Sequence, residues 1–263
     1  MSIASELSAL NGYILGAYGE INTKGGTVPA NKNMANLATA IGSIESVGIP
    51  REVSSGGIYQ VPADNFTFSL PANATDIGSS ALAYAFRNCQ GLSSVDLSSL
   101  TRVTGSGALY YAFYHCNNLR SVDLSSLTKI TDSDALYYAF YHCISLRSID
   151  LSSLTTVTGS RALAYAFSGC QGLSSVDLSS LTTVTGSRAL YFAFQGCNGL
   201  TSLSFPALTT SSFGTATNQF DNMLSGVRGC TVHFPASIQS TIGGWSSVQN
   251  GFNGTNTTVL FDL

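Results

Sequence analysis

The sequence predicts an α/β solenoid, in which short parallel strands stack on one side and short helices on the other. Cysteines recur at a constant interval of 27 residues, and an interval of about 20 to 50 residues marks a protein built from stacked repeats. Within each interval, a helix-like spacing of apolar residues is followed by a strand-like alternation. The recurring cysteines are Cys89, Cys116, Cys143, Cys170 and Cys197.

Each repeat has the same internal order. The fourth unit is GSRALAYAFSGCQGLSSVDLSSLTTVT. One face of a short helix is indicated by the i, i+3, i+4, i+7 spacing of Leu163, Ala166, Phe167 and Cys170. A strand is indicated by the alternation of Val176, Asp177 and Leu178. We therefore expect a short helix, a turn, a short strand and a loop in units that begin at Gly78, Gly105, Asp132, Gly159 and Gly186.

The strand pattern continues beyond these units and predicts eight rungs. Neighbouring strands pair about 4.8 Å apart, whereas packed helices need about 8 to 10 Å. We therefore expect the array to curve, with its strands on the concave side and its helices on the convex side. The apolar pairs of the rungs are Phe68/Leu70, Val95/Leu97, Val122/Leu124, Ile149/Leu151, Val176/Leu178, Leu203/Phe205, Val232/Phe234 and Val259/Phe261.

Three parts make up the predicted organisation. Residues 1–46 hold two amphipathic stretches, the first with a heptad-like spacing, and predict a helical attachment or oligomerisation segment or a hairpin packed on the array. Residues 47–64, with Pro50 and Gly56, predict a linker. Residues 65–263 form the solenoid, with an N-cap (65–77), five repeats (78–212) and a C-cap (213–263), because terminal rungs must shield the core.

Composition excludes several classes of partner. Charged residues make up 10% of the chain and the formal net charge is −3, so no basic field attracts nucleic acid or anionic lipid. The N-terminus lacks a signal-peptide pattern, and no stretch approaches the roughly 18 apolar residues of a spanning helix. We expect no nucleic-acid partner and no membrane insertion.

The recurring cysteines are expected to be buried and reduced. Equivalent positions in successive repeats give parallel side chains, which suit a buried ladder better than disulfide bridges. Free thiols indicate synthesis in a cytoplasm. Cys230 falls outside the 27-residue register, and its state stays open.

The candidate binding site lies on the predicted helices. The outward positions of the second and third units carry aromatic rings where neighbouring units carry smaller or polar residues. A contiguous aromatic patch usually marks a partner surface, and Tyr and His offer both ring faces and hydrogen bonds. The alternative is that one of these positions has a packing role. The position of Tyr111 and Tyr138 is occupied in the other repeats by Tyr84, Tyr165 and Phe192, and these rings would pack on neighbouring helices or on the N-terminal segment. The predicted ligand-binding residues are Tyr110, Tyr111, Tyr114, His115, Tyr137, Tyr138, Tyr141 and His142.

A second feature is a column of carboxylates on the strands, formed by Asp96, Asp123, Asp150 and Asp177. Side chains about 4.8 Å apart repel unless their pKa values rise, a cation binds, or hydrogen bonds stabilise the charge. We expect hydrogen bonds, because each Asp precedes Leu-Ser-Ser, a sequence that favours turns. Calcium is the alternative, with Arg120 and Arg147 as further neutralising groups.

Signatures of catalysis and cofactors are missing from the sequence. It has three His residues, no CxxC and no Gly-rich phosphate loop, so we expect neither an enzyme nor a cofactor. His115 and His142 without a neighbouring carboxylate or Cys make a weak metal site. Hydrolysis of a glycan by the Asp column is the catalytic alternative, although equivalent carboxylates have no reason for distinct pKa values.

Two resemblances follow from particular motifs. The unit AFxxCxxLxxVxL, present as AFRNCQGLSSVDL and AFSGCQGLSSVDL, resembles the BspA-like leucine-rich repeats of bacterial and protist surface proteins over about residues 65 to 235. It implies a leucine-rich-repeat solenoid. The segments INTKGGTVPANKNMANLATAIGSI, FPASIQSTIGGW and NGTNTTVLFDL resemble terminal segments of phage and prophage tail proteins. These imply a virion attachment module that carries a host-binding solenoid.

The predicted function is therefore that of a phage or prophage tail adhesin, made in the host cytoplasm and located in the virion tail. Its solenoid would recognise a bacterial surface glycan or protein. Residues 1–46 would bind tail or baseplate proteins, or further copies of the chain. The alternatives are a bacterial cell-surface adhesin and a structural or assembly protein of a phage tail.

Overall fold

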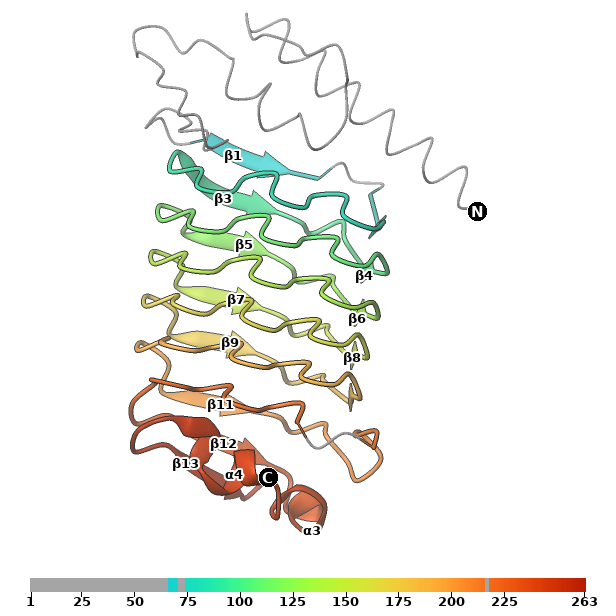
Figure 1. The fold of residues 1–263 in the computed structure, drawn as a ribbon, viewed down its shortest axis with the longest axis vertical. Helices are drawn as coiled ribbons and strands as arrows, with labels where there is room; N and C mark the ends of the chain where they lie inside the picture. Colours follow the sequence, from blue (N-terminus) through green and yellow to red (C-terminus); the bar gives the residue numbers. More distant parts are fainter. Residues whose placement is uncertain (1–65, 71–73, 216–217) are drawn as a thin grey trace, which may run out of the picture.

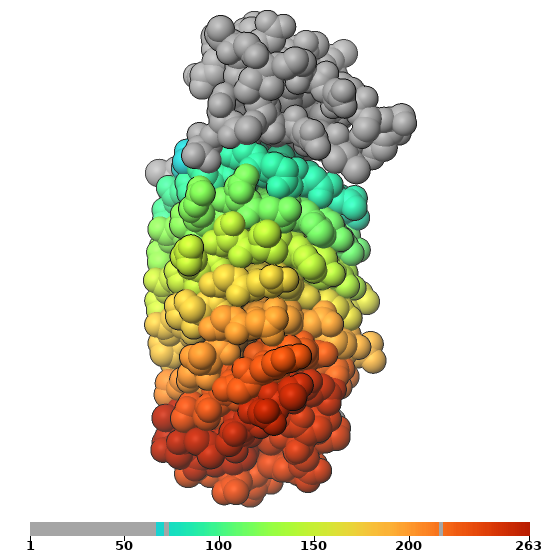
Figure 2. Space-filling view, turned by 90° about the vertical axis from the view of Figure 1, so that its left-hand side faces the viewer, coloured from blue at the N-terminus to red at the C-terminus, as the bar shows by residue number. Residues whose placement is uncertain are grey.

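The computed structural model describes residues 66–70, 74–215 and 218–263. Within these ranges the chain forms a solenoid of stacked rungs, which both views show with little curvature (Figures 1 and 2). The predicted helical segment 1–46 and linker 47–64 lie outside the described residues.

The first wall of the solenoid consists of the eight strands that the sequence predicts. All pairs are parallel, in the orders β1-β3-β5-β7-β9 and β11-β12-β13. The 27-residue interval sets the register, so that Val95 pairs with Val122. The strands are β1 Phe66–Ser69, β3 Leu92–Asp96, β5 Ser121–Asp123, β7 Ser148–Asp150, β9 Ser175–Asp177, β11 Ser202–Ser204, β12 Thr231–Phe234 and β13 Thr258–Phe261.

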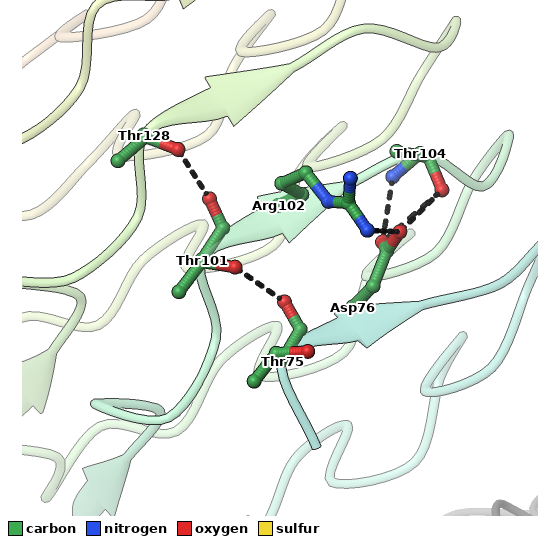
Figure 3. A network of polar contacts seen from close by, with 6 residues as sticks. All are labelled: Thr75, Asp76, Thr101, Arg102, Thr104 and Thr128. Atoms are coloured by element: carbon green, nitrogen blue, oxygen red, sulfur yellow. Dashed lines mark hydrogen bonds and ion pairs between the residues drawn. The ribbon is translucent and has the colours of Figure 1, made fainter. Parts of the chain in front are cut away.

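A second wall occupies the segments that we expected to be loops. Its two-residue strands pair in parallel, and their buried residues alternate with exposed or half-buried ones. Threonine hydroxyls brace this wall, because Thr128 Oγ1 donates to the Thr101 carbonyl at 2.8 Å and Thr101 Oγ1 to that of Thr75 at 3.0 Å (Figure 3). In the first rung, Asp76 accepts hydrogen bonds from Thr104. The strands are β2 Asp76–Ile77, β4 Arg102–Val103, β6 Lys129–Ile130, β8 Thr156–Val157 and β10 Thr183–Val184.

The third wall corrects the expectation of short helices. Its segments are consecutive turns, in which every fourth residue has a positive φ that no α-helix contains. In the third repeat these residues are Asp134 (φ 57°), Tyr138 (56°) and His142 (57°). We call this face the turn wall. The α-helices and 3₁₀-helices of the described residues lie instead near the C-terminus, as η1 Ala236–Ile238, α3 Gln239–Ile242, α4 Ser246–Gln249 and η2 Gly251–Asn253.

Hydrogen bonds between rungs explain why the stack is nearly straight. Along the turn wall, the backbone N–H groups alternate between two kinds of acceptor. One N–H donates to a carbonyl of the next rung, as Phe86 N does to Ala112 O at 2.8 Å, and another donates to the carbonyl three residues earlier, as Cys89 N does to Phe86 O at 3.1 Å. Direct backbone bonds hold the turn segments about as far apart as strands. The expected curvature rested on the wider spacing of packed helices, and that cause is absent from the described walls.

The core between the walls is a set of side-chain columns. Phe86, Phe113, Phe140, Phe167 and Phe194 are at most 1% exposed and stack with centroids 5.1 to 5.7 Å apart. Beside them, the five recurring cysteines are free and buried, as predicted. Cys143 Sγ donates to Phe113 O at 3.2 Å, and the thiols of Cys116, Cys170 and Cys197 bond the preceding turn segment in the same way. Cys230 is also free and buried.

The C-terminal segment closes the core at one end. Trp245 contacts Phe213 edge-on at 5.2 Å, and Phe252 is fully buried. Its short helices lie below the last rungs, and the space-filling view shows this segment covering the lower end of the stack (Figure 2). The C-terminal segment therefore shields the core of the last rungs from solvent.

Candidate functional site

The eight predicted binding residues lie together on the turn wall, in the second and third repeats. Equivalent positions align along the solenoid axis, so the rings form four columns, each named here by its members in these two repeats. The Tyr110/Tyr137 rings stack at 5.3 Å, Tyr111/Tyr138 at 4.8 Å, Tyr114/Tyr141 at 5.0 Å and His115/His142 at 4.9 Å. We call these eight side chains the aromatic patch.

The Tyr111/Tyr138 column extends beyond the patch. Tyr84, Tyr165 and Phe192 continue it through all five repeats, with stacked centroids 4.5 to 5.4 Å apart. This arrangement is the packing on neighbouring turn segments that the sequence left open as an alternative. Each residue of the column has a positive φ, which costs about 1 to 2 kcal/mol for a residue with a Cβ. Ring stacking of about 0.5 to 1.5 kcal/mol per pair offsets that cost.

The Tyr114/Tyr141 and His115/His142 columns stop after the third repeat. Their next members are Ser168 and Gly169, so no ring of the fourth repeat stacks on Tyr141 among the described residues. A Cβ on Gly169 would meet the His142 ring at 2.4 Å, which shows that this ring leans over the glycine. The columns therefore end at Tyr141 and His142, and the two small residues that follow them are buried.

Mutual stacking decides what the patch presents to a ligand. Most ring faces are covered by other rings, so hydroxyl groups, imidazole nitrogens and ring edges form the accessible surface. Burial raises the pKa of Tyr111 to about 12 and also raises that of Tyr110, Tyr138 and Tyr141. These phenols remain protonated at neutral pH and are available as hydrogen-bond donors.

Arginines border the patch. The Arg87 guanidinium lies 5.1 Å from the Tyr114 ring centre and 5.9 Å from that of Tyr111, within the range of cation–π contacts. At the opposite edge, Arg161 lies 5.7 Å from the Tyr137 ring and pairs with Asp134 at 2.8 Å. Sequence reasoning missed both arginines as members of the site. Alignment of the repeats places each arginine next to the tyrosines, and this alignment was the signal that could have identified them.

The histidine pair is an unfavourable metal site. Its rings are nearly parallel, with an interplanar angle of 13° at 4.9 Å, so their nitrogens do not converge on one point. Within the described ranges, no group of three or more His, Cys, Asp or Glu side chains could hold a metal ion. Burial, the His142 charge and the Arg87 charge lower the pKa of His115.

The carboxylate column forms as predicted, with Asp96, Asp123, Asp150 and Asp177 in register on the first wall. Each carboxylate accepts a hydrogen bond from the backbone N–H two residues later, at 2.9 to 3.0 Å. Hydrogen bonds from Ser98 and Ser152 lower the pKa values of Asp96 and Asp150. The geometry supports turn formation, the alternative that we preferred to calcium.

The expected arginine neutralisation of this column does not occur in the described residues. Neither Arg120 nor Arg147 makes an ion pair there; the ion pairs within hydrogen-bonding range of a carboxylate involve Arg102, Arg161 and His233. Local hydrogen bonds already stabilise the carboxylates, so the column needs no cation. The two arginines stand exposed at the edge of the first wall.

Solved structures of similar proteins include several leucine-rich-repeat proteins. A leucine-rich-repeat protein of T. pallidum is 19% identical, with a TM-score of 0.33, over 74% of this chain and 87% of that chain. A leucine-rich-repeat protein of Bacteroides ovatus is 19% identical, with a TM-score of 0.27, over 73% and 60%. A leucine-rich cell surface protein of Faecalibacterium prausnitzii is 15% identical, with a TM-score of 0.26, over 74% and 88%. These low scores leave the family assignment to the sequence.

No curated protein matches the chain. A family model does match, in two overlapping stretches at residues 63–164 and 137–239. These stretches contain the five 27-residue units and the strands that flank them. The chain belongs to the family described as BspA type leucine rich repeat region.

Proposed function

We propose that the chain is a surface-recognition module, an adhesin, whose turn wall binds a bacterial receptor through the aromatic patch. One observation carries this proposal. Five repeats with nearly identical core residues differ on the turn wall, and the rings of the second and third repeats form one continuous surface. Core packing fixes the shared residues, but it does not require Tyr and His where the fourth repeat has Ser168 and Gly169.

The composition of the patch supports recognition. Tyrosines and histidines held by mutual stacking lose little conformational freedom on binding, and they offer donors and acceptors along one surface. Ile144, at the lower border, is 42% exposed where the other repeats have Asn or Gln. An exposed aliphatic side chain beside stacked rings adds apolar contact area. A repeat scaffold with these features favours binding over catalysis.

The proposed setting is the tail of a phage or prophage particle. The terminal segments that resemble phage tail proteins support this setting, with residues 1–46 as the attachment to tail or baseplate proteins. Labelling of induced particles with antibody against the solenoid tests it by electron microscopy. Label at the tail tip is the expected result. Label confined to bacterial cell walls would instead favour a cell-surface adhesin.

Cell binding tests the site itself. Fluorescently labelled protein is incubated with a panel of Gram-positive and Gram-negative cells, and the double variant Tyr114→Ala, Tyr141→Ala is compared with the parent. Each ring is expected to contribute about 1 to 2 kcal/mol, so each substitution weakens binding about 5- to 30-fold. Both tyrosines are half-buried, and we expect each substitution also to lower stability by about 1 to 2 kcal/mol.

A matched control separates binding from stability. Tyr191 occupies the Tyr110/Tyr137 column in the fifth repeat, is half-buried and lies under Arg188 at 5.2 Å, outside the patch. Tyr191→Ala should cost similar stability and leave cell binding unchanged. Equal binding by the double variant and the parent, or no binding to any cell of the panel, would rule out the proposed site. Loss of particle assembly with cell binding intact would favour a structural role.

A further inference from the structure

We propose that the patch recognises an acidic glycan through a cationic cluster formed by Arg87, His115 and His142, and that binding strengthens as the pH falls. The inference rests on the proposed function and adds the charge of its ligand. The sugar would lie against Tyr141, and its carboxylate or phosphate would face the cluster.

The cluster sits at one end of the patch. Arg87 occupies the Tyr114/Tyr141 column one repeat earlier, is exposed, and makes no ion pair in the part of the chain that the structure describes. The His115 ring lies 4.4 Å from the Tyr114 ring, 5.7 Å from that of Tyr141 and 4.9 Å from that of His142. Three groups that carry or acquire positive charge thus share one face.

Among the described residues, no carboxylate acts on His115. The charged groups that act on His115 are His142 and Arg87, both of the same sign as the imidazolium. Asp134, the acid of the patch, acts on Tyr110 at the far end and is already paired with Arg161 at 2.8 Å. A ligand that relieves the repulsion at the His115 end must therefore bring a negative charge.

The pH dependence follows from linkage. Burial, and after it the His142 and Arg87 charges, lower the pKa of His115, so the free protein holds this imidazole neutral at pH 7. A bound anion favours the protonated form, raises that pKa and makes binding take up a proton. Affinity must then increase as the pH falls from 7.5 to 5.5, through the range in which imidazoles titrate.

The accessible ring edges and hydroxyl groups beside the cluster suit a sugar. Ser168, which follows Tyr141 in the column, is 2% exposed and donates a hydrogen bond to Gln195 at 3.0 Å, so the accessible parts of Tyr141 are its ring edge and hydroxyl group. The hydroxyl groups of a sugar can hydrogen-bond these phenol hydroxyls and the neighbouring imidazole nitrogens. The Tyr141 and His115 centroids are 5.7 Å apart, so one acidic sugar residue spans both contacts.

Defined polymers test the inference directly. Binding of the parent protein to polygalacturonate and to poly(glycerol phosphate) is measured by biolayer interferometry at pH 5.5 and 7.5, with methyl-esterified polygalacturonate as the uncharged match. We expect at least one acidic polymer to bind about tenfold more tightly at pH 5.5, and the ester to bind weakly at both values. Preference for one polymer distinguishes carboxylate from phosphate. Failure of both acidic polymers at pH 5.5 overturns the inference.

Two glycine variants provide a sharp structural test. Gly169 and Gly196 occupy the same position in adjacent repeats, with φ of 76° and 66°, so an alanine causes similar backbone strain at each. A Cβ at Gly169 meets the His142 ring at 2.4 Å, whereas at Gly196 the nearest atom is 4.0 Å away. Gly169→Ala should displace His142 and reduce the pH dependence, while Gly196→Ala keeps it. Equal pH profiles for the two variants would contradict the role of His142.

Substitutions within the cluster complete the test. His142→Asn introduces the residue that Asn88 already places at this positive-φ position, and Arg87→Gln copies Gln195 from the same column. Each should weaken binding of the preferred acidic polymer about fivefold or more at pH 5.5, whereas Arg87→Lys should retain most of it. Unchanged affinity in both neutral variants refutes the cluster.

Native cells separate the two proposals. Cells that bind the parent protein are treated with carbodiimide and glycinamide to block carboxylates, or with cold hydrofluoric acid to remove phosphate polymers. Loss of binding after either treatment supports an acidic glycan. Binding that survives both treatments and does not vary with pH leaves the adhesin function standing and ends the inference. Loss after protease alone identifies a protein receptor and also ends it.

Discussion

Removing one ring from the phenylalanine column should destabilise the whole array. Phe140 is fully buried in the central repeat and stacks on Phe113 at 5.1 Å and on Phe167 at 5.6 Å. Phe140→Ala removes buried apolar area and leaves a cavity, a change that typically costs about 3 to 5 kcal/mol. Two lost ring pairs, worth about 0.5 to 1.5 kcal/mol each, place the expected loss toward the upper end of that range.

Urea denaturation followed by circular dichroism measures this loss as a shift in the midpoint. Because each repeat contacts only its neighbours, a defect in the third repeat also weakens the coupling between the two halves of the array. We expect a broadened or two-step transition. Ile144→Ala, in the same repeat at an exposed apolar position, is the matched control and should cost less than about 1 kcal/mol. Similar midpoints for the two variants would refute the stacked-core account.

Two further predictions concern the cysteines and the carboxylates. Burial raises the pKa of the Cys89 and Cys170 thiols to about 12. The native protein should therefore react with Ellman's reagent far more slowly than the urea-unfolded chain. Fast labelling of Cys143 in the native protein would contradict the buried cysteine ladder. The folded pKa of Asp150 lies below its unfolded value, so its stabilisation is full above the unfolded pKa and is lost as the pH falls through the folded pKa. Asp150→Asn should lower the melting temperature at pH 6 but not at pH 2, and an equal effect at both would exclude a charge-assisted turn.

The strand wall was predictable because its signal is local and repeats without change. Val95, Val122 and Ile149 alternate with aspartates at a constant interval, which fixes both the strand and its register. The second wall was missed for a physical reason. A strand such as Thr156–Val157 has two residues, too few for an alternation to appear, and rung-to-rung hydrogen bonds stabilise it rather than its own sequence.

The turn wall was mistaken for helices because two periods nearly coincide. Its buried residues recur every four positions, as in Ala85 and Cys89, and over nine residues this pattern barely differs from the 3.6-residue period of a helix. The discriminating signal was a column of Asn88, two histidines, Gly169 and Gly196, since Asn, His and Gly are the residues that best tolerate a positive φ. Tyrosine in the neighbouring positive-φ column gave the opposite indication, because stacking rather than backbone preference keeps it there.

The same geometry explains how the array carries a specific surface without losing its fold. Backbone hydrogen bonds between rungs hold the turn wall, so the outward side chains of one repeat change without altering the spacing of the next. His115 and His142 have a positive φ, as Asn88 and Gly169 do at the same position of other repeats. The need for a positive φ therefore does not select histidine over glycine. Histidine in two adjacent repeats, next to an Arg87 that makes no ion pair in the described structure, is what the proposed acidic-glycan site requires. Comparison of Gly169→Ala with Gly196→Ala separates these two requirements, because both alanines strain the backbone and only the first displaces an imidazole.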